Sequence, residues 1–370
     1  MFKRYKQYQE DVPIINEINS TMTKCVTDWY GPNAYISSPK PIVKANRNSF
    51  FIIYDIAITS KKKIRVFLKI RRQTRLKSLS AAINSNITHD NTRKEYEALV
   101  AIYNFFKDKV AMFDVVRPLF FFDKWYAMAI EERQSTHLDK LIHDWPLYTK
   151  IKVLNFPDLL NAVQKVGYWL ATYHREMHSQ QEVPYSSQEL SDEIREALSN
   201  LSTASNETLQ LERLNSAFSQ KIAGLNLETL PFSIIHGDFK NENILVTHDN
   251  RICVIDLKPT HDTIYSDLGQ ILIDPDTYKI QIFTFGVFFS KRFLEKYRDA
   301  IIKGYFQDEP FDQALVKLYC AISLLDKWTL NEKIINNYQD FRKYVSLSIR
   351  PIMRYYFNKL ILSYLSPETG

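Results

Sequence analysis

The segment from His236 to Asp256 constrains this chain more than any other. It reads HGDFKNENILV, then a polar turn, then the apolar residues ICVI and Asp256. Two short apolar runs around a polar turn predict a β-hairpin in which residues 244–246 pair with residues 252–255. The pattern places one carboxylate, Asp238, in the loop before the hairpin and a second, Asp256, where the returning strand ends.

The polar residues of this segment are of the types that phosphoryl transfer to a hydroxyl requires. One carboxylate must orient and deprotonate the acceptor, and an amide and a second carboxylate must hold Mg²⁺ on the nucleotide phosphates. Asp238 suits the first role, and Asn243 and Asp256 suit the second. A simple hairpin with an Asx-rich turn is the alternative, and it leaves the spacing of the three polar residues unexplained.

HGDFKNENILV resembles the catalytic loop of the phosphotransferase family that includes aminoglycoside phosphotransferases and choline kinases, within the protein kinase-like superfamily. The resemblance implies a two-lobed α+β fold, with ATP and Mg²⁺ as cofactors. It also implies a catalytic role for Asp238 and metal binding by Asn243 and Asp256. Lys240 matches the loop of protein serine/threonine kinases, where the lysine contacts the transferred phosphate, and the alternative is a lysine on a surface loop.

Strand patterns dominate the first third of the chain. Residues 50–59 (FFIIYDIAIT) and 64–70 (IRVFLKI) predict an antiparallel pair across a polar turn at residues 60–63. Further strands are expected at residues 41–44, 115–122 and 125–130, and a helix over 92–107. Together they predict a small, mostly antiparallel sheet in a nucleotide-binding lobe, residues 1–132.

From about residue 133 onward the pattern is mainly helical. A long amphipathic helix is expected over residues 156–178, and a polar insert with helical stretches at 179–230 would form a lid or substrate platform. We therefore expect a helical C-terminal lobe, residues 133–370, that carries the catalytic segment 236–256. A sheet-rich part followed by a helical part is an α+β arrangement.

Lys69 is the expected phosphate-binding lysine of the small lobe. It lies on the third strand, shares a face with Phe67, and could reach the α- and β-phosphates. A lysine on a strand is otherwise simply solvent-facing, and Arg71 and Arg72 compete with it. The sequence KEYEAL resembles the family's Glu-x-Glu-x-Leu helix start and selects Glu95 as its partner.

Two alternatives to that partner stay open. One is a capping box, in which Thr92 caps the helix and Glu95 occupies its third position. The other is Glu97 as the partner of Lys69.

The resemblance also extends to the rest of the nucleotide site. Residues 46–49 replace a glycine-rich phosphate loop without any glycine, which favours the small-molecule branch of the superfamily and points to Ser49 as a phosphate contact. Glu131, Glu132 and Arg133 fall where the hinge between the lobes should contact adenine.

Three further polar residues are expected to be structural. His174, on the helix that packs behind the catalytic loop, and His236, within the loop, should act through hydrogen bonds and not in the chemistry. Asp267 matches the family's Asp-Leu pair, whose carboxylate fixes the backbone of the catalytic loop.

Composition and charge indicate the cellular compartment and the surfaces that the protein could contact. The net charge is +6, and the three cysteines show no metal-binding spacing, which indicates reduced thiols in the cytoplasm. The sequence contains neither a secretory signal nor a run apolar enough for a membrane span. Residues 291–298 and 350–359 interleave cations with aromatic rings, which could meet anionic sugars or the inner face of a membrane, or could form a solvated helix face.

These observations predict an ATP- and Mg²⁺-dependent phosphotransferase that acts on a hydroxyl of a small molecule or glycan, such as a cell-surface or lipopolysaccharide-type sugar. No nucleic-acid-binding motif is present. A protein serine/threonine kinase is the second candidate: Lys240 favours it, and the missing glycine loop and the absent DFG and APE signatures oppose it. A non-catalytic scaffold is the third, although it would need none of the four residues Lys69, Asp238, Asn243 and Asp256. The acceptor and the oligomeric state stay open.

Overall fold

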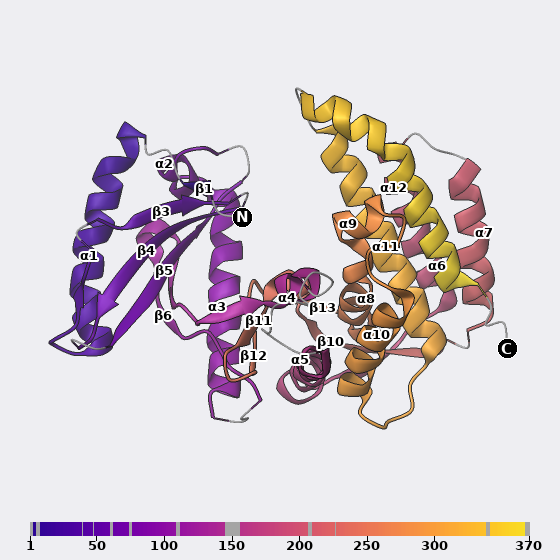
Figure 1. Cartoon of the computed structure of the whole chain (residues 1–370), viewed down its shortest axis with the longest axis horizontal. Coiled ribbons are helices and arrows are strands. Elements are labelled where there is room, and N and C mark those ends of the chain that lie inside the picture. Colours follow the sequence, from indigo (N-terminus) through magenta and orange to yellow (C-terminus); the bar gives the residue numbers. More distant parts are fainter. Residues whose placement is uncertain are drawn as a thin grey trace. The chain divides into compact units, whose positions relative to one another are not determined.

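The computed structural model describes residues 3–4, 8–38, 40–46, 48–59, 62–73, 76–108, 112–144, 156–205, 209–225, 227–337 and 341–366. The chain divides into two compact units (Figure 1). Unit 1 comprises Met1–Ser135 with Thr247–Asp249 and Cys253–Leu257, and unit 2 comprises Thr136–Val246, Asn250–Ile252 and Lys258–Gly370. The lobe boundary expected after residue 132 stays a prediction.

Among the described residues, unit 1 contains a seven-stranded antiparallel sheet of order β1-β3-β4-β5-β7-β6, with β2 paired to β4. The strands are β1 Lys3–Arg4, β2 Tyr35–Ile36, β3 Ile42–Ala45, β4 Ser49–Ala57, β5 Lys63–Arg71, β6 Pro118–Phe122 and β7 Ala127–Glu131. The predicted antiparallel pair is β4 and β5, and the strands expected on either side of it in the sequence are also present. Ser60 and Lys61, in the turn expected between β4 and β5, lie outside the described residues.

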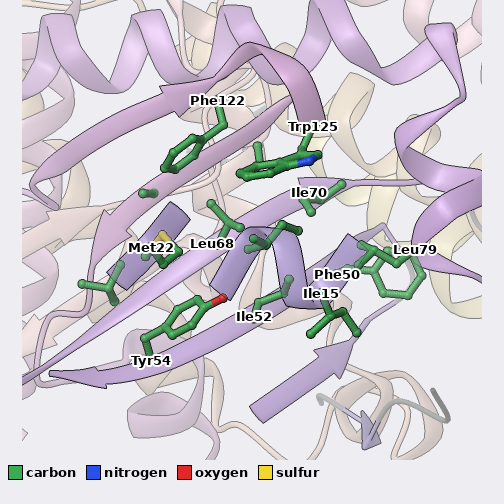
Figure 2. Close-up of a cluster of buried hydrophobic side chains, with 14 of the residues drawn as sticks. Ile15, Met22, Phe50, Ile52, Tyr54, Leu68, Ile70, Leu79, Phe122 and Trp125 are labelled. Carbon is green, nitrogen blue, oxygen red and sulfur yellow. The ribbon is translucent and has the colours of Figure 1, made fainter. Parts of the chain in front are cut away.

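Strand alternation decides what each face of this sheet carries. Val66, Leu68 and Ile70 of β5 are buried against α1 (Val12–Tyr30), in a core that also receives α2 (Leu79–Ile83) and Trp125 (Figure 2). Because successive side chains point to opposite faces, Lys69 projects to the other face. There it meets α3 (His89–Phe106).

Helix α1 was not predicted from the sequence. Its signal was an apolar residue every three or four positions, at Ile15, Ile18, Met22 and Val26, the spacing of one helix face. All four are buried. Polar residues separate these four positions, so a search for continuous apolar runs does not detect the helix.

Unit 2 is mainly helical. Its helices are α4 Leu138–Asp144, α5 Phe156–Ala171, α6 Ser187–Ser205, α7 Leu209–Ala223, α8 Ile264–Ile273, α9 Lys279–Phe283, α10 Lys291–Phe306, α11 Gln313–Asn336 and α12 Phe341–Leu365. The helix expected over residues 156–178 is α5 followed by a π-helical turn, Thr172–Met177. The polar insert 179–230 forms β9, α6, α7 and the start of β10, and its role as a lid or platform stays a prediction.

Helices α5 and α10 pack closely because two glycines meet at their crossing. A Cβ atom on Gly167 would lie 2.2 Å from the carbonyl oxygen of Ile301, and one on Gly304 would lie 2.0 Å from that of Gln164. Any larger side chain at either position would force the helices apart. This contact holds α5, and with it the π-helical turn that carries His174, against α10.

Two further three-stranded sheets occur in the described part of the chain, with orders β13-β10-β9 and β12-β11-β8, and the second includes strands of the catalytic segment. Their strands are β8 Ser135–His137, β9 Gln181–Pro184, β10 Thr229–Ile235, β11 Ile244–Thr247, β12 Ile252–Val254 and β13 Thr260–Thr263. The predicted hairpin is β11 and β12. Together with unit 1, this arrangement confirms the predicted α+β class.

Candidate active site

The catalytic loop begins with a turn that only glycine fits. Gly237 has φ +75°, and a Cβ atom there would lie 2.3 Å from the carbonyl oxygen of Lys258. The backbone N–H of Lys258 donates to the carbonyl oxygen of His236 at 2.9 Å. The loop and the residues after Asp256 are therefore pressed together, backbone against backbone.

A buried carboxylate fixes this turn from behind. Asp267 on α8 accepts hydrogen bonds from the backbone N–H groups of His236 at 2.6 Å and Gly237 at 3.0 Å. Its side chain is fully buried and lies 3.1 Å from Nε2 of His174. This geometry confirms the structural role predicted for Asp267.

Both histidines are placed as expected. His174 lies in the π-helical turn, is fully buried, and has Nδ1 2.9 Å from the hydroxyl of Tyr305. Nδ1 of His236 accepts the backbone N–H of Asp238 at 3.3 Å. Each histidine holds the loop in place through hydrogen bonds, as a structural residue would.

Asp238 lies between two ammonium groups. Its Oδ2 is 2.7 Å from Nζ of Lys258, and its Oδ1 is 3.4 Å from Nζ of Lys240. Burial alone would raise the pKa of Asp238, but the positive charges of Lys240 and Lys258 outweigh it, so the pKa lies below its usual range. The carboxylate is therefore ionised at neutral pH, which is the state that a proton acceptor needs.

Lys258 is a functional candidate that was not predicted from the sequence. The available signal was a lysine two positions after the metal-binding candidate, in a segment with no other strong pattern. The contact with Asp238 depends on the fold, since 20 residues separate the two.

Asn243 is tied to the same loop. It ends a 3₁₀ turn, Asn241–Asn243, is buried, and donates through Nδ2 to the backbone oxygen of Asp238 at 2.9 Å. This bond uses the NH₂ end of the amide. The side-chain oxygen is the atom that a hard cation would take as a ligand.

Within unit 1, Lys69 joins two carboxylates. Its Nζ lies 2.7 Å from Oε1 of Glu95 and also contacts Oδ1 of Asp256. Glu95 receives a second cation, Nε of Arg71 at 2.6 Å. Burial lowers the pKa of Lys69, but Glu95 and Asp256 more than compensate, so the pKa lies above its usual value and the ammonium stays charged.

Asp256 adopts an unusual backbone conformation, with φ +59°. Aspartate tolerates this left-handed region better than most residues, yet it still costs energy and is found most often at functional sites. The returning strand of the hairpin ends two residues earlier, at Val254. The chain therefore turns sharply at the carboxylate that Lys69 contacts.

The structure decides between the alternatives for Glu95. Helix α3 starts at His89 with Thr88 as its N-cap, so Glu95 lies in the second turn and is not the third residue after a Thr92 cap. The capping-box alternative is therefore wrong. Glu97 is exposed, whereas Glu95 is buried and paired with Lys69.

The other predicted nucleotide contacts lie in unit 1. Ser49 is buried at the start of β4, where the side chain of Asn46 accepts its backbone N–H at 2.7 Å. Asn46 and Ser49 therefore belong to an Asx turn. Glu131 accepts the hydroxyl of Tyr30, and Arg133 donates to the carbonyl oxygen of Val115 at 2.8 Å. Contacts of Ser49, Glu131 and Arg133 with a nucleotide stay predictions.

Solved structures share the fold. A glucosamine kinase is 13% identical and covers 95% of this chain and 82% of its own, with a TM-score of 0.54. Glucosamine kinase in complex with glucosamine, ADP and inorganic phosphate is also 13% identical, with coverages of 88% and 83% and a TM-score of 0.51. Choline kinase LicA from Streptococcus pneumoniae is 12% identical, with coverages of 97% and 99% and a TM-score of 0.49. At such identities, the likeness to the two glucosamine kinase structures shows a shared fold alone.

No curated protein sequence matches the chain. A sequence model of the phosphotransferase enzyme family, however, matches residues 88–315, which is more than half of the chain. The matched range includes Glu95, the catalytic loop and Asp256. It bears out the resemblance drawn from the loop and favours that family over the protein kinases. The chain belongs to the phosphotransferase enzyme family.

Proposed function

We propose that the protein transfers the γ-phosphate of ATP to a hydroxyl group of a small molecule or glycan, with Asp238 as the general base. The observation that carries this proposal is the state of Asp238: an ionised carboxylate on a loop whose backbone Asp267 holds from behind. Such a group can orient an acceptor hydroxyl and take its proton as the bond to phosphorus forms. Lys240, beside it, would neutralise charge on the transferred phosphate.

The remaining predicted residues suit the nucleotide and its metal. Asn243 and Asp256 offer amide and carboxylate oxygens, the ligand types that Mg²⁺ prefers, and Lys69 offers a charged ammonium for the α- and β-phosphates. When bound, Mg²⁺ would neutralise part of the phosphate charge. Ser49, Glu131 and Arg133 are proposed contacts for the phosphates and adenine. The ADP in a glucosamine kinase complex supports an adenine nucleotide.

The charges around Asp238 bear on the acceptor. Two ammonium groups lie within 3.4 Å of its carboxylate oxygens. A polycationic acceptor would bring further positive charge to this place, which costs Coulomb energy. An uncharged or anionic sugar hydroxyl suits the loop better, and this supports a glycan acceptor over an aminoglycoside. In protein kinases, a lysine at the position of Lys240 also contacts the transferred phosphate. The acceptor screen therefore includes basic protein as well.

The test is an ATP-consumption screen on the purified full-length chain with Mg²⁺, across sugars, anionic sugars, amino alcohols, aminoglycosides, glycolipids and basic protein. With the acceptor found, Asp238→Asn should lower kcat by on the order of 10²–10⁴ and leave ATP binding nearly intact, because the base contacts the acceptor. Asp308→Asn, an exposed carboxylate in unit 2, is the control and should behave as wild type. Near-normal turnover by a folded Asp238→Asn protein would refute the assignment, and phosphorylation of the basic protein alone would favour the protein kinase.

A further inference from the structure

Unit 2 presents large apolar side chains to solvent at the end of α9 and on the short loop that follows it. The exposed fractions are 44% for Phe283, 54% for Phe285 and 77% for Val287. On α12, Tyr355 is 57% exposed, and its ring lies 6.4 Å from that of Phe285. We name Phe283–Val287 together with Tyr355 the aromatic loop surface. Helix α9 lies beside α12 (Figure 1).

The loop is held in shape by groups beneath it. Gln281 is buried, its carbonyl oxygen accepts the N–H of Gly286 at 2.8 Å, and its side chain accepts the N–H of Phe289 at 2.8 Å. Phe285 has φ +52°. A bulky residue in this left-handed region is strained, because its Cβ atom crowds the following carbonyl oxygen. The fold therefore maintains an unfavourable backbone conformation at a residue whose ring is largely exposed, which indicates a role outside folding.

The sequence segments that carry this surface contain basic residues and no acidic ones. No Asp or Glu occurs between Asp276 and Glu295, and none occurs in residues 341–365 of α12. Cations flank the exposed rings: Lys279 lies one helical turn before Phe283, Lys359 lies one turn after Tyr355, and Lys291 and Arg292 follow the loop. All four of these cations are exposed. Lys291 makes one long contact, 3.7 Å, with Glu295.

We propose that the aromatic loop surface docks the protein onto a membrane that contains anionic phospholipids. Exposed Phe, Val and Tyr side chains enter the boundary between headgroups and acyl chains, and the lysines and arginine around them are attracted to the negative surface. A second copy of the chain would bring the same cations against each other, so the charge pattern opposes self-association through this surface. In the described part of the chain no helix is long and apolar enough to span a membrane.

Cosedimentation of the purified full-length chain with vesicles tests this proposal. We expect binding to vesicles of phosphatidylcholine with phosphatidylglycerol, little binding to phosphatidylcholine alone, and a decrease as salt is raised. Phe285→Ser/Val287→Ser should weaken partitioning by roughly tenfold or more, because it removes two apolar groups from the boundary. Lys291→Gln/Arg292→Gln should lose roughly fivefold per charge removed.

The controls separate surface effects from folding. Tyr35→Ser removes another exposed aromatic side chain, 63% exposed in unit 1, and should leave binding unchanged. Val287→Ser alone changes the most exposed residue of the loop. It should keep the wild-type melting temperature and still weaken binding to anionic vesicles. Equal binding to neutral and anionic vesicles, no vesicle binding by the wild type, or unchanged binding by both loop variants would each overturn the proposal. Self-association that the loop variant abolishes, without vesicle binding, would identify a second copy as the occupant and overturn it as well.

Discussion

Glu95→Ala should destabilise unit 1 far more than an ordinary helix substitution. The carboxylate is buried and pairs with Nζ of Lys69 at 2.7 Å and Nε of Arg71 at 2.6 Å. Removing one partner of a buried ion pair costs about 3–5 kcal/mol, since the other charge is left without compensation. Lys69 keeps its contact with Asp256, so we expect the lower end, about 3 kcal/mol. For a unit of this size that corresponds to a fall of roughly 6–12 °C in melting temperature.

The assay is thermal unfolding together with ATP binding by calorimetry, with Mg²⁺ present. Glu97→Ala is the matched control, because it removes an exposed carboxylate from the same helix two residues away, and it should stay within about 0.5 kcal/mol of wild type. Lys69→Ala and the double variant complete a cycle. Because either single change already breaks the pair, the double variant should cost clearly less than the sum of the two.

Two results would refute this reasoning. One is a Glu95→Ala protein that melts within a few degrees of Glu97→Ala, which would mean that the buried pair contributes little. The other is full additivity of Lys69→Ala and Glu95→Ala, which would show that the two side chains act independently. If a destabilised Glu95→Ala protein binds ATP normally, the ion pair contributes to stability but has no role in nucleotide binding.

Two further predictions concern the catalytic loop. Lys258→Gln removes one of the two positive charges that, against burial, hold the pKa of Asp238 below its usual range. Because the base works ionised, activity is lost as pH falls through its pKa, so the acid limb of the kcat/KM profile should move to higher pH. The control Lys291→Gln, at an exposed lysine, should leave the acid limb in place. An unmoved limb would contradict the pairing of Lys258 with Asp238. Gly237→Ala should destabilise unit 2 by at least about 1–2 kcal/mol from its positive φ alone, with a further loss of turnover as the loop shifts from Lys258. Wild-type stability and turnover of Gly237→Ala would argue against both the strained turn and its close contact with Lys258.

The sequence by itself determined the local elements and the chemistry of single residues. The alternation of β5 fixed which side chains share a face, because successive residues point in opposite directions, and so it placed Lys69 on the face opposite Leu68. The hairpin after the catalytic loop followed from two apolar runs around a polar turn, and the role of Asp267 followed from the resemblance to the phosphotransferase family. Helix α1 was missed although its apolar spacing was present, since its stripe is interrupted by polar residues.

Only the tertiary structure decided which charges meet. Glu95, Glu97 and the capping box were all compatible with the local sequence, and the choice came from where α3 begins and which of its faces lies against β5. The pairing of Lys258 with Asp238 joins residues 20 positions apart, through a turn in which Gly237 lets two backbones touch. Such contacts depend on the packing of whole elements against one another. A single sequence specifies that packing only through the sum of many weak interactions, so no local pattern reveals it.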